Sequence, residues 1–393
     1  MRSSISSSDA LERISKPAPG PHLHAVPRPT PVEPPVHDVR RDVPAHNWLA
    51  MGAVSLLACA LMLGLWERHV RALGYEPDYD DTTSLWVKQR QRAVSARSDQ
   101  LVLVGDSRTL YNLDLDVLEH AGVGPRPIQL ATVGSNPMVV LEDLAKDPSY
   151  AGTTLVGVVP GLLAAGGGPA LSSPARYVRK YHEWSPAAEW ELALSLLVQK
   201  QLAFIQKDDL TLSQLLKRSP LPRRSAAYAP ELPPSFSQID LDRRTRITAR
   251  AERDAALMQR IGNIWLALFA GPPKPSILSD AQWEKILSDG WESNLKRVKH
   301  AVAAIEARGG KVVFVRHPSS GKLRELEDRI TPRAAIWDRL LAETGARGIY
   351  DQDYPALSSF ECPELSHLSA ADSVEYTKRL TAILKEQGLI PAP

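Results

Sequence analysis

The sequence has little cysteine, with only Cys59 and Cys362 among its 393 residues. Two cysteines cannot build a disulfide framework or a set of thiolates with zinc-ligand spacing. An excess of charge of one sign is also lacking, since 47 Lys and Arg residues face 45 Asp and Glu residues. No basic run with interleaved aromatics stands out. This composition rules out a fold held by disulfides or a structural metal, and nucleic acid is not an expected partner.

Proline is present in quantity and is concentrated at the N-terminus. Residues 1–46 carry nine of the 32 prolines and hardly any large apolar side chain. Such a segment cannot build a core, and its prolines favour extended polyproline II. We expect a disordered, Pro-rich tail over residues 1–46, either passive or used as a docking peptide.

One long uncharged run follows, from Trp48 to Trp66. At about 1.5 Å per residue, its nineteen residues come close to the ~30 Å hydrocarbon thickness of a bilayer. A tryptophan at each end suits the membrane interface. We predict one transmembrane helix over residues 47–66, with a buried core helix as the alternative.

Two kinds of processing compete with an uncleaved anchor. Ala58-Cys59-Ala60 is similar to a signal-peptidase site, and the four residues ending at Cys59 are similar to a lipoprotein box. The segment stays apolar well beyond Cys59, however, and the preceding tail is long for a signal peptide. We therefore expect an uncleaved anchor. Arginines are nearly as frequent after this segment as before it, so the positive-inside rule favours a cytoplasmic N-terminus only slightly.

From about residue 100 the sequence alternates apolar β-rich runs with helical periodicity, which predicts an α/β fold with a parallel sheet and right-handed crossovers. The expected strands are Leu101–Val104, Pro127–Leu130, Leu155–Val159, Val312–Arg316 and Gly348–Tyr350. The expected helices are Leu113–His120, Met138–Ala145, Asn294–Ala307, Ala334–Thr344 and Ala370–Glu386.

The expected organisation is a linker over 67–99 and an α/β domain in two parts, 100–164 and 291–393. A mostly helical insertion at 165–290 separates the two parts. Its tryptophans, Trp184, Trp190, Trp265 and Trp283, suit a packed core better than a sugar-binding surface.

The sharpest chemical signal is Gly105-Asp106-Ser107 at the end of a four-residue apolar strand. Open parallel sheets place their sites at the carboxyl ends of strands, so Ser107 stands where a nucleophile would be presented. The glycine permits a sharp turn into the helical pattern that follows. Serine is also an ordinary turn and cap residue.

A second signal is Glu364-Leu-Ser-His367, just before the last amphipathic helix. A carboxylate three residues before a histidine can hold one ring nitrogen while the other faces a nucleophile. Together with Ser107, this pattern indicates a serine hydrolase.

These motifs resemble the SGNH (GDSL-type) hydrolase superfamily, in particular its membrane-anchored members that accompany O-acetylation of cell-surface polysaccharide. The resemblance implies a three-layer, flavodoxin-like domain with Ser107 as nucleophile, His367 as base and Glu364 as acid. It also implies oxyanion donors at Ser107 and at Gly134 in Ala131-Thr-Val-Gly134-Ser-Asn136. The stretch Val315-Arg316-His317-Pro318 is similar to a sequence motif of the membrane-anchored members.

Two features depart from that family. Glu364 stands where Asp is usual, so its longer side chain must fold back or leave a Ser–His dyad. The expected Gly-x-Asn-Asp block is replaced by Pro160-Gly161-Leu-Leu, which lacks the oxyanion-donating asparagine. Asn136, Arg108 and Arg316 are candidate substitutes, the two arginines as substrate-binding residues. Each has a structural alternative: Asn136 as a cap, for example, and Arg316 as a partner of Asp106.

The resemblance implies an inner-membrane, single-pass protein with a cytoplasmic N-terminus and a periplasmic main domain. It implies a serine esterase or O-acyltransferase acting on acyl esters of envelope polysaccharide, partnered by a multispanning membrane acyltransferase. Neither a metal nor a cofactor is expected. The alternative is a catalytically inactive SGNH-like scaffold, or a glycan-binding component of an exopolysaccharide assembly machine.

Overall fold

The computed structural model describes residues 47–94, 96–97, 99–205, 232–271 and 274–390. Contacts divide the chain into two units, Met1–Leu57 and Ala58–Pro393. The predicted Pro-rich tail, residues 1–46, lies outside the described residues. Of the first unit, the structure describes only 47–57, where helix α1 begins.

Helix α1 spans Trp48–Ala72 and is long and apolar enough to cross a membrane. It continues six residues beyond Trp66, the predicted end of the apolar span. Its apolar side chains, such as Leu49 and Leu56, are exposed rather than packed in a core. The alternative of a buried core helix is therefore wrong.

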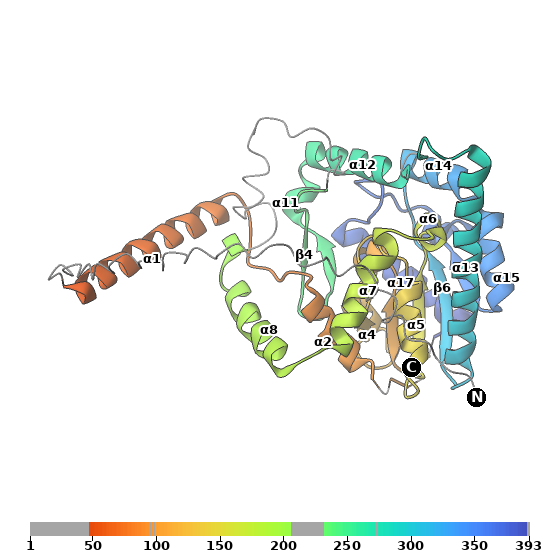
Figure 1. The fold of residues 1–393 in the computed structure, drawn as a ribbon, viewed down its shortest axis with the longest axis horizontal. Coiled ribbons are helices and arrows are strands. Elements are labelled where there is room, and N and C mark those ends of the chain that lie inside the picture. The colour runs from red at the N-terminus through yellow and green to blue at the C-terminus, as the bar shows by residue number, and fades with distance from the viewer. Residues whose placement is uncertain (1–46, 95, 98, 206–231, 272–273, 391–393) are drawn as a thin grey trace, which may run out of the picture. The chain divides into compact units, whose positions relative to one another are not determined.

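A five-stranded parallel sheet forms the centre of the second unit (Figure 1), in the order β2-β1-β3-β6-β7. All four strand pairs of this sheet are parallel, as the alternation predicted. The strands are β1 (Leu101–Val104), β2 (Ile128–Gln129), β3 (Thr153–Gly157), β6 (Lys311–Arg316) and β7 (Arg347–Tyr350).

Helices cover both faces of this sheet, which explains why its strands are apolar runs rather than alternating patterns. Val102 and Val104 of β1 pack in one apolar cluster with α2, α5 and α13. Leu101 and Leu103 pack in another cluster with α4 and α17. The helices of the two layers are α2 (Thr83–Arg92), α5 (Met138–Lys146), α13 (Asp280–Glu306), α15 (Arg339–Thr344), α3 (Ser107–Asn112), α4 (Leu115–His120) and α17 (Ala370–Glu386).

The described part of the segment predicted as an insertion is mostly helical, but it also contains an antiparallel hairpin that the sequence did not predict. Its elements are α7 (Pro169–His182), α8 (Pro186–Gln199), η1 (Ala203–Ile205), β4 (Ser237–Ile239), β5 (Thr245–Ile247), α11 (Ala249–Glu252) and α12 (Ala255–Phe269). Apolar side chains of α12 form a third cluster with Leu110 and Tyr111 of α3. The insertion thus packs against the helix that begins with Ser107.

Several boundaries differ from the prediction. The strand expected at Leu155–Val159 lies two residues earlier, and the helix expected from Asn294 begins at Asp280, inside the expected insertion. Helices that were not predicted include α2 in the expected linker and α14 (Gly321–Ile330) after β6. The remaining elements are α6 (Pro160–Ala164), a π-helical turn (Ala334–Asp338), η3 (Asp351–Asp353) and α16 (Pro355–Ser358).

Candidate active site

The strand-to-helix turn after β1 presents Ser107 as predicted from the sequence. β1 ends at Val104, and Ser107 is the first residue of α3 and is half-buried. Asp106 caps this helix, since its Oδ1 accepts a hydrogen bond of 2.7 Å from the N–H of Arg108. A Cβ atom on Gly105 would collide with the Thr109 side chain, so this tight turn requires glycine.

Glu364 and His367 form the acid–base pair that their spacing predicted. Glu364 Oε1 lies 2.7 Å from His367 Nδ1 and also accepts the backbone N–H of His367 at 2.6 Å. The other oxygen, Oε2, accepts the backbone N–H of Ser366 at 3.3 Å. The side chain of Glu364 therefore folds back on its own loop, which accommodates its extra methylene compared with Asp.

This pairing defines the tautomer of His367. An ionised carboxylate only accepts hydrogen bonds, so the hydrogen between the two groups belongs to Nδ1. Nε2 is then left with its lone pair, and this atom is buried with no partner among the described residues. The structure thus holds an imidazole oriented by a carboxylate with a free accepting nitrogen, which is the arrangement of a general base.

Aromatic rings surround His367, which is 1% exposed. The centroid of its ring lies 4.4 Å from that of Tyr111, 5.7 Å from that of Trp265 and 6.1 Å from that of Phe236. These apolar walls restrict the imidazole to one orientation. They also exclude water, which strengthens its interaction with Glu364.

Helix α3 and the loop that carries His367 lie side by side, although 260 positions separate Ser107 from His367 in the sequence. Arg108 Nε donates to Ser366 Oγ at 3.2 Å, and Asn112 Oδ1 accepts the N–H of Leu368 at 3.0 Å. Tyr111, which contacts the ring of His367, follows Ser107 by one helical turn on the same face of α3. These contacts bring the Ser107 helix and the His367 loop together, but among the described residues no hydrogen bond joins Ser107 Oγ to His367 Nε2.

The loop before His367 adopts a strained conformation. Leu365 has a φ of 76°, in the left-handed region that non-glycine residues seldom occupy. This turn lets the N–H groups of Ser366 and His367 point back to Glu364. Ser320 holds the loop from α14, because its N–H donates to Leu365 O at 2.9 Å and its Oγ accepts the N–H of Cys362 at 2.8 Å.

Trp265 completes the surroundings of the acid and was not predicted as a site residue. Its indole Nε1 donates a hydrogen bond to Glu364 Oε2. Trp265 lies on α12 in the insertion and is buried, which agrees with the expected core role, but its polar edge binds the carboxylate. A tryptophan in an apolar helix gave no sequence signal for this second role.

Gly134 lies in a turn that is tied to the Ser107 turn. The N–H of Thr132 donates a hydrogen bond of 3.0 Å to Gly105 O. Gly134 lies two residues after Thr132, and Ser107 lies two residues after Gly105. Gly134 has a φ of 61°, is exposed, and has open space where a side chain would be. One backbone hydrogen bond thus joins the two turns, and the role of Gly134 as an oxyanion donor stays a prediction.

Asn136 is not available as the side-chain oxyanion donor that we expected. It is fully buried, its Nδ2 donates to Leu163 O at 3.0 Å, and its Oδ1 accepts the N–H of Met138 at 3.0 Å. These bonds brace the start of α5 and the end of α6. The structural alternative, a cap, is confirmed, and the missing oxyanion donor has no replacement in this side chain.

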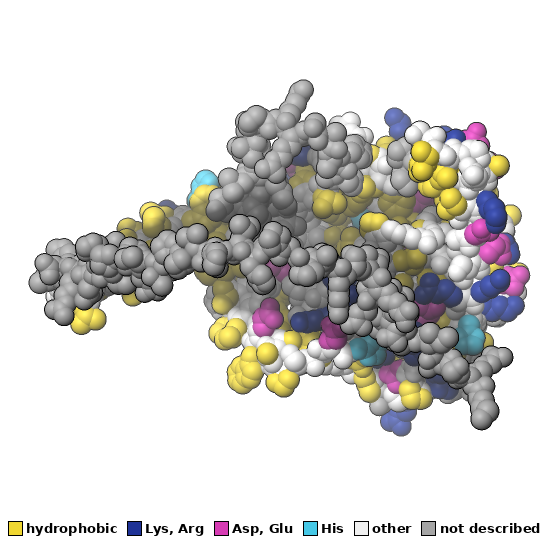
Figure 2. Space-filling model, viewed as in Figure 1, with side chains coloured by type: hydrophobic (Ala, Val, Ile, Leu, Met, Phe, Trp, Pro, Cys, Tyr) yellow, Lys and Arg dark blue, Asp and Glu magenta, His cyan; other side chains and the backbone are white. Residues whose placement is uncertain are grey.

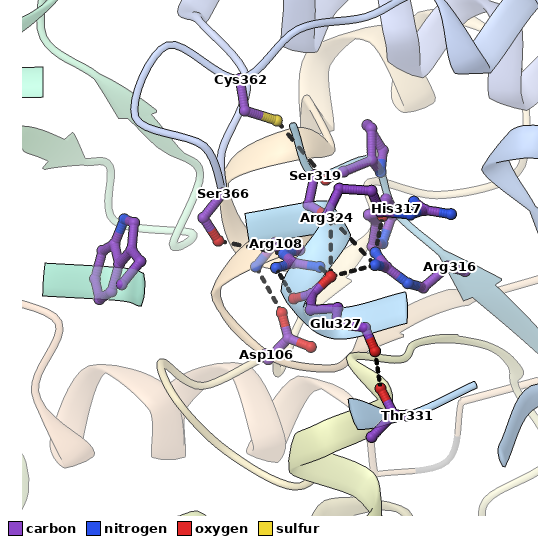
Figure 3. A network of polar contacts seen from close by, with 12 residues as sticks. Asp106, Arg108, Arg316, His317, Ser319, Arg324, Glu327, Thr331, Cys362 and Ser366 are labelled. Carbon is purple, nitrogen blue, oxygen red and sulfur yellow. Dashed lines mark hydrogen bonds and ion pairs between the residues drawn. The ribbon is translucent and has the colours of Figure 1, made fainter. Parts of the chain in front are cut away.

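Arg108 and Arg316 are not available to bind substrate either, because both are buried and paired with the same carboxylate, that of Glu327 on α14 (Figure 3). The guanidinium of Arg108 binds both oxygens of Glu327. Arg316 NH2 binds Glu327 Oε2, and Ser319 Oγ donates to the same oxygen at 2.9 Å. The expected pairing of Arg316 with Asp106 is replaced by this shared ion pair.

Burial alone would raise the pKa of Glu327, but the charges of Arg108 and Arg316 outweigh it and lower that pKa to about 2. Glu327 was missed because Gly321–Ile330 carries so many charges that it is indistinguishable in sequence from a solvated helix.

Two neighbouring groups cannot take over the roles of His367 and Ser107. Burial, together with the charges of Arg108 and Arg316, lowers the pKa of His317 to about 3, and its Nδ1 lies 3.0 Å from Tyr376 Oη. Burial raises the pKa of the Cys362 thiol to about 12, so almost no thiolate exists at neutral pH. The candidate base and nucleophile therefore remain His367 and Ser107.

Replacing Glu327 by Gln should destabilise the fold strongly. The variant leaves Arg108 and Arg316 buried without their counter-charge, which typically costs about 3–5 kcal/mol in the free energy of unfolding. Urea unfolding of the full chain in detergent at neutral pH measures this loss. The matched control is Glu343→Gln, which breaks the exposed pair with Lys299 and should change stability by about 1 kcal/mol or less.

The same comparison has a defined pH dependence. The pKa of Glu327 is depressed from 4.5 in the folded protein, so its stabilisation is present above pH 4.5 and is lost as the pH falls towards 2. The difference in the free energy of unfolding between the native chain and Glu327→Gln should therefore become smaller as the pH falls from 4.5 towards 2. Equal stabilities of the Glu327 and Glu343 variants at neutral pH would show that the buried network does not contribute to the fold as described.

Comparison with known proteins adds no family assignment to this geometry. No protein-family model matches the chain, and no curated protein matches it either. The argument about function therefore depends on the site residues themselves.

Proposed function

We propose that the protein is a membrane-anchored serine esterase or O-acyltransferase of the SGNH type, acting on acyl esters of cell-envelope polysaccharide. One observation carries the proposal: the Glu364–His367 hydrogen bond leaves Nε2 free beside the helix that begins with Ser107. Serine hydrolases on unrelated folds share a histidine oriented in this way that activates a serine, and the proposal requires Ser107 Oγ to come within hydrogen-bonding reach of Nε2.

The proposed reaction has two steps. In the first, Ser107 Oγ gives its proton to His367 Nε2 and attacks the acyl carbonyl, while the backbone N–H groups of Ser107 and Gly134 bind the developing oxyanion. The tetrahedral intermediate collapses to an acyl-serine, and the leaving alkoxide takes the proton from His367. In the second, His367 deprotonates the acceptor, which attacks the acyl-serine; the tetrahedral intermediate collapses, and His367 returns the proton to Ser107 Oγ as the C–O bond to serine breaks.

The acceptor decides the type of enzyme. Water gives hydrolysis of the ester, and a sugar hydroxyl gives acyl transfer. The resemblance to the anchored SGNH proteins favours transfer, with acyl groups supplied by a multispanning membrane acyltransferase. The polysaccharide substrate and this partner are part of the proposal, as is the absence of a cofactor.

The proposed location is the inner membrane, crossed once by α1, with a cytoplasmic N-terminus and a periplasmic catalytic domain. The length and composition of α1 support the anchor, and the positive-inside rule leans slightly to this orientation. An alkaline phosphatase reporter fused after Pro393 should be active, because alkaline phosphatase folds only in an oxidising compartment such as the periplasm. A reporter that works only in the cytoplasm should be inactive when fused at the same position. If that cytoplasmic reporter is active, the catalytic domain lies in the cytoplasm, and a cell-envelope polysaccharide cannot be the substrate.

The second candidate is a catalytically inactive scaffold or glycan-binding component of an exopolysaccharide assembly machine. The buried, fully engaged amide of Asn136 favours it, because no side chain then replaces the missing oxyanion donor. Loss of one such donor typically costs about 10²–10³ in kcat. A slow enzyme and a scaffold are therefore the two alternatives to distinguish.

A fluorophosphonate probe distinguishes them. The purified full chain should be labelled covalently at Ser107, because the probe requires a serine activated by a base. Ser107→Ala should abolish labelling, whereas Ser172→Ala, which removes an exposed hydroxyl on α7, should leave it unchanged. Labelling that survives Ser107→Ala would eliminate the proposed nucleophile, and a folded native chain that is not labelled would favour the scaffold.

Trp265→Phe should lower kcat for hydrolysis of an activated acetyl ester by about tenfold or more. The variant keeps the aromatic packing but removes a hydrogen bond to a charged group, which is worth about 1.5–3 kcal/mol. KM should change little, because Trp265 binds Glu364 and acts as a positioning residue. The kcat profile against pH should shift as well, since the orientation of His367 depends on Glu364.

Trp291→Phe is the matched control for that variant. Trp291 is also buried, but its indole nitrogen has no hydrogen-bond partner among the described residues. Its replacement removes an N–H group without breaking a hydrogen bond and should leave kcat and KM unchanged. Equal losses of kcat in both variants would mean that Trp265 contributes only packing.

A further inference from the structure

Helix α8 has two apolar faces, and the described residues of the protein cover only one of them. Ala188 and Leu192 are buried on the inner face. On the opposite face Trp190, Leu194 and Leu197 are 72%, 61% and 62% exposed, so the expectation of a packed core is wrong for Trp190. Hydrophobic side chains are visible in Figure 2 at the lower left, where Figure 1 draws α8.

We call the exposed residues Trp190, Leu194, Leu197 and Val198 the outer stripe of α8. Their spacing of four, three and one residues places them on one side of the helix. Glu189 and Glu191 flank the stripe, and Glu189 is bound by Lys88 of α2 at 2.8 Å, so the helix is held with this side outward. A row of large apolar side chains on a helix normally marks a surface that another apolar phase covers.

The end of α8 is attached to the end of α1. Arg71 NH2 donates to Gln201 O at 2.9 Å. The N–H groups of Ala203 and Phe204 donate to the carboxylate of Glu67, at 2.9 Å to Oε1 and 3.0 Å to Oε2. Glu67 directly follows Trp66, at which the uncharged run ends. The chain leaving α8 is therefore bound to the first charged turn after the candidate membrane span.

We propose that the outer stripe of α8 lies in the membrane–water interface, where it inserts into the lipid as a second, peripheral contact beside α1. The first charged turn after a span lies at the depth of the lipid headgroups. The hydrogen bonds that Glu67 accepts and Arg71 donates hold the chain leaving α8 at that depth. Trp190 has the amphipathic indole that is typical of this zone. The inference rests on the proposed membrane anchoring by α1 and is independent of the proposed catalysis.

The two native cysteines allow a direct test in the full chain. Cys59 lies exposed on α1, whereas Cys362 is buried and its thiol is protonated, so a thiol reagent labels Cys59 alone. An environment-sensitive fluorophore is attached to Cys59 in the native chain, and to the new thiol in Cys59→Ala/Leu194→Cys and Cys59→Ala/Leu197→Cys. Cys59→Ala/Lys378→Cys is the control on α17, where the Lys378 side chain is 60% exposed.

Each labelled protein is reconstituted into vesicles of phosphatidylethanolamine and phosphatidylglycerol. A fraction of the lipid carries a doxyl quencher on the acyl chain near the headgroup. We expect blue-shifted emission and quenching by the doxyl lipid at positions 59, 194 and 197, and neither at 378. Because the vesicles contain no other protein, quenching reports contact with lipid itself.

Three results would contradict the proposal, each in a different way. Quenching at 59 without quenching at 194 and 197 would overturn the interfacial contact and leave the anchor intact. A blue shift at 194 without quenching would mean that a second copy of the chain covers the outer stripe. Absence of quenching at 59 would overturn the membrane anchor, and with it this inference.

Discussion

The carboxylate of Glu327 is shared by two buried arginines, and the candidate active site depends on this shared charge. Arg108 stands next to Ser107 on α3, and Arg316 is the last residue of β6. Through its Nε, Arg108 also binds Ser366, the neighbour of His367. One ionised side chain thus connects the helix of the proposed nucleophile, the central sheet and the loop of the proposed base. Buried charges tolerate little displacement, because the free energy lost when each charge leaves water is larger than the free energy gained from a poorly oriented partner.

The acid of the site is held by a different part of the chain. Glu364 accepts hydrogen bonds from Trp265 on α12, from two backbone N–H groups and from His367. A glutamate in place of the usual aspartate is consistent with this arrangement, since its longer side chain curls back within a loop whose turn at Leu365 is strained. The insertion therefore contributes to the chemistry that we propose, although it lies outside the sequence motifs that indicate it.

The sheet was predictable because a strand buried on both faces is a continuous apolar run, and the motifs near Ser107 and His367 were predictable because their chemistry depends on local spacing. The roles of Arg108 and Arg316 were not, since both bind Glu327 on a helix that the sequence did not predict. For Asn136 the local cap was foreseen as an alternative, but its bond to Leu163 O was not. The hairpin of β4 and β5 escaped prediction because its strands have three residues each, too few for a period of two to emerge. The start of α13 was misjudged because its first turns are largely exposed, so no buried apolar stripe marks them in the sequence.

The continuity of α13 has a consequence for protein engineering. Its first half belongs to the segment between the two parts of the α/β domain, while Leu295, Val298 and Val302 in its second half cover the sheet. Asn294 in between clamps the end of α6 through Leu163 O and Ala165 O. A minimal domain made by excising residues 165–290 would therefore truncate a sheet-covering helix and discard the indole that binds Glu364. Redesign of this protein must proceed by exchanging side chains within that segment, with the segment itself retained as part of the working scaffold.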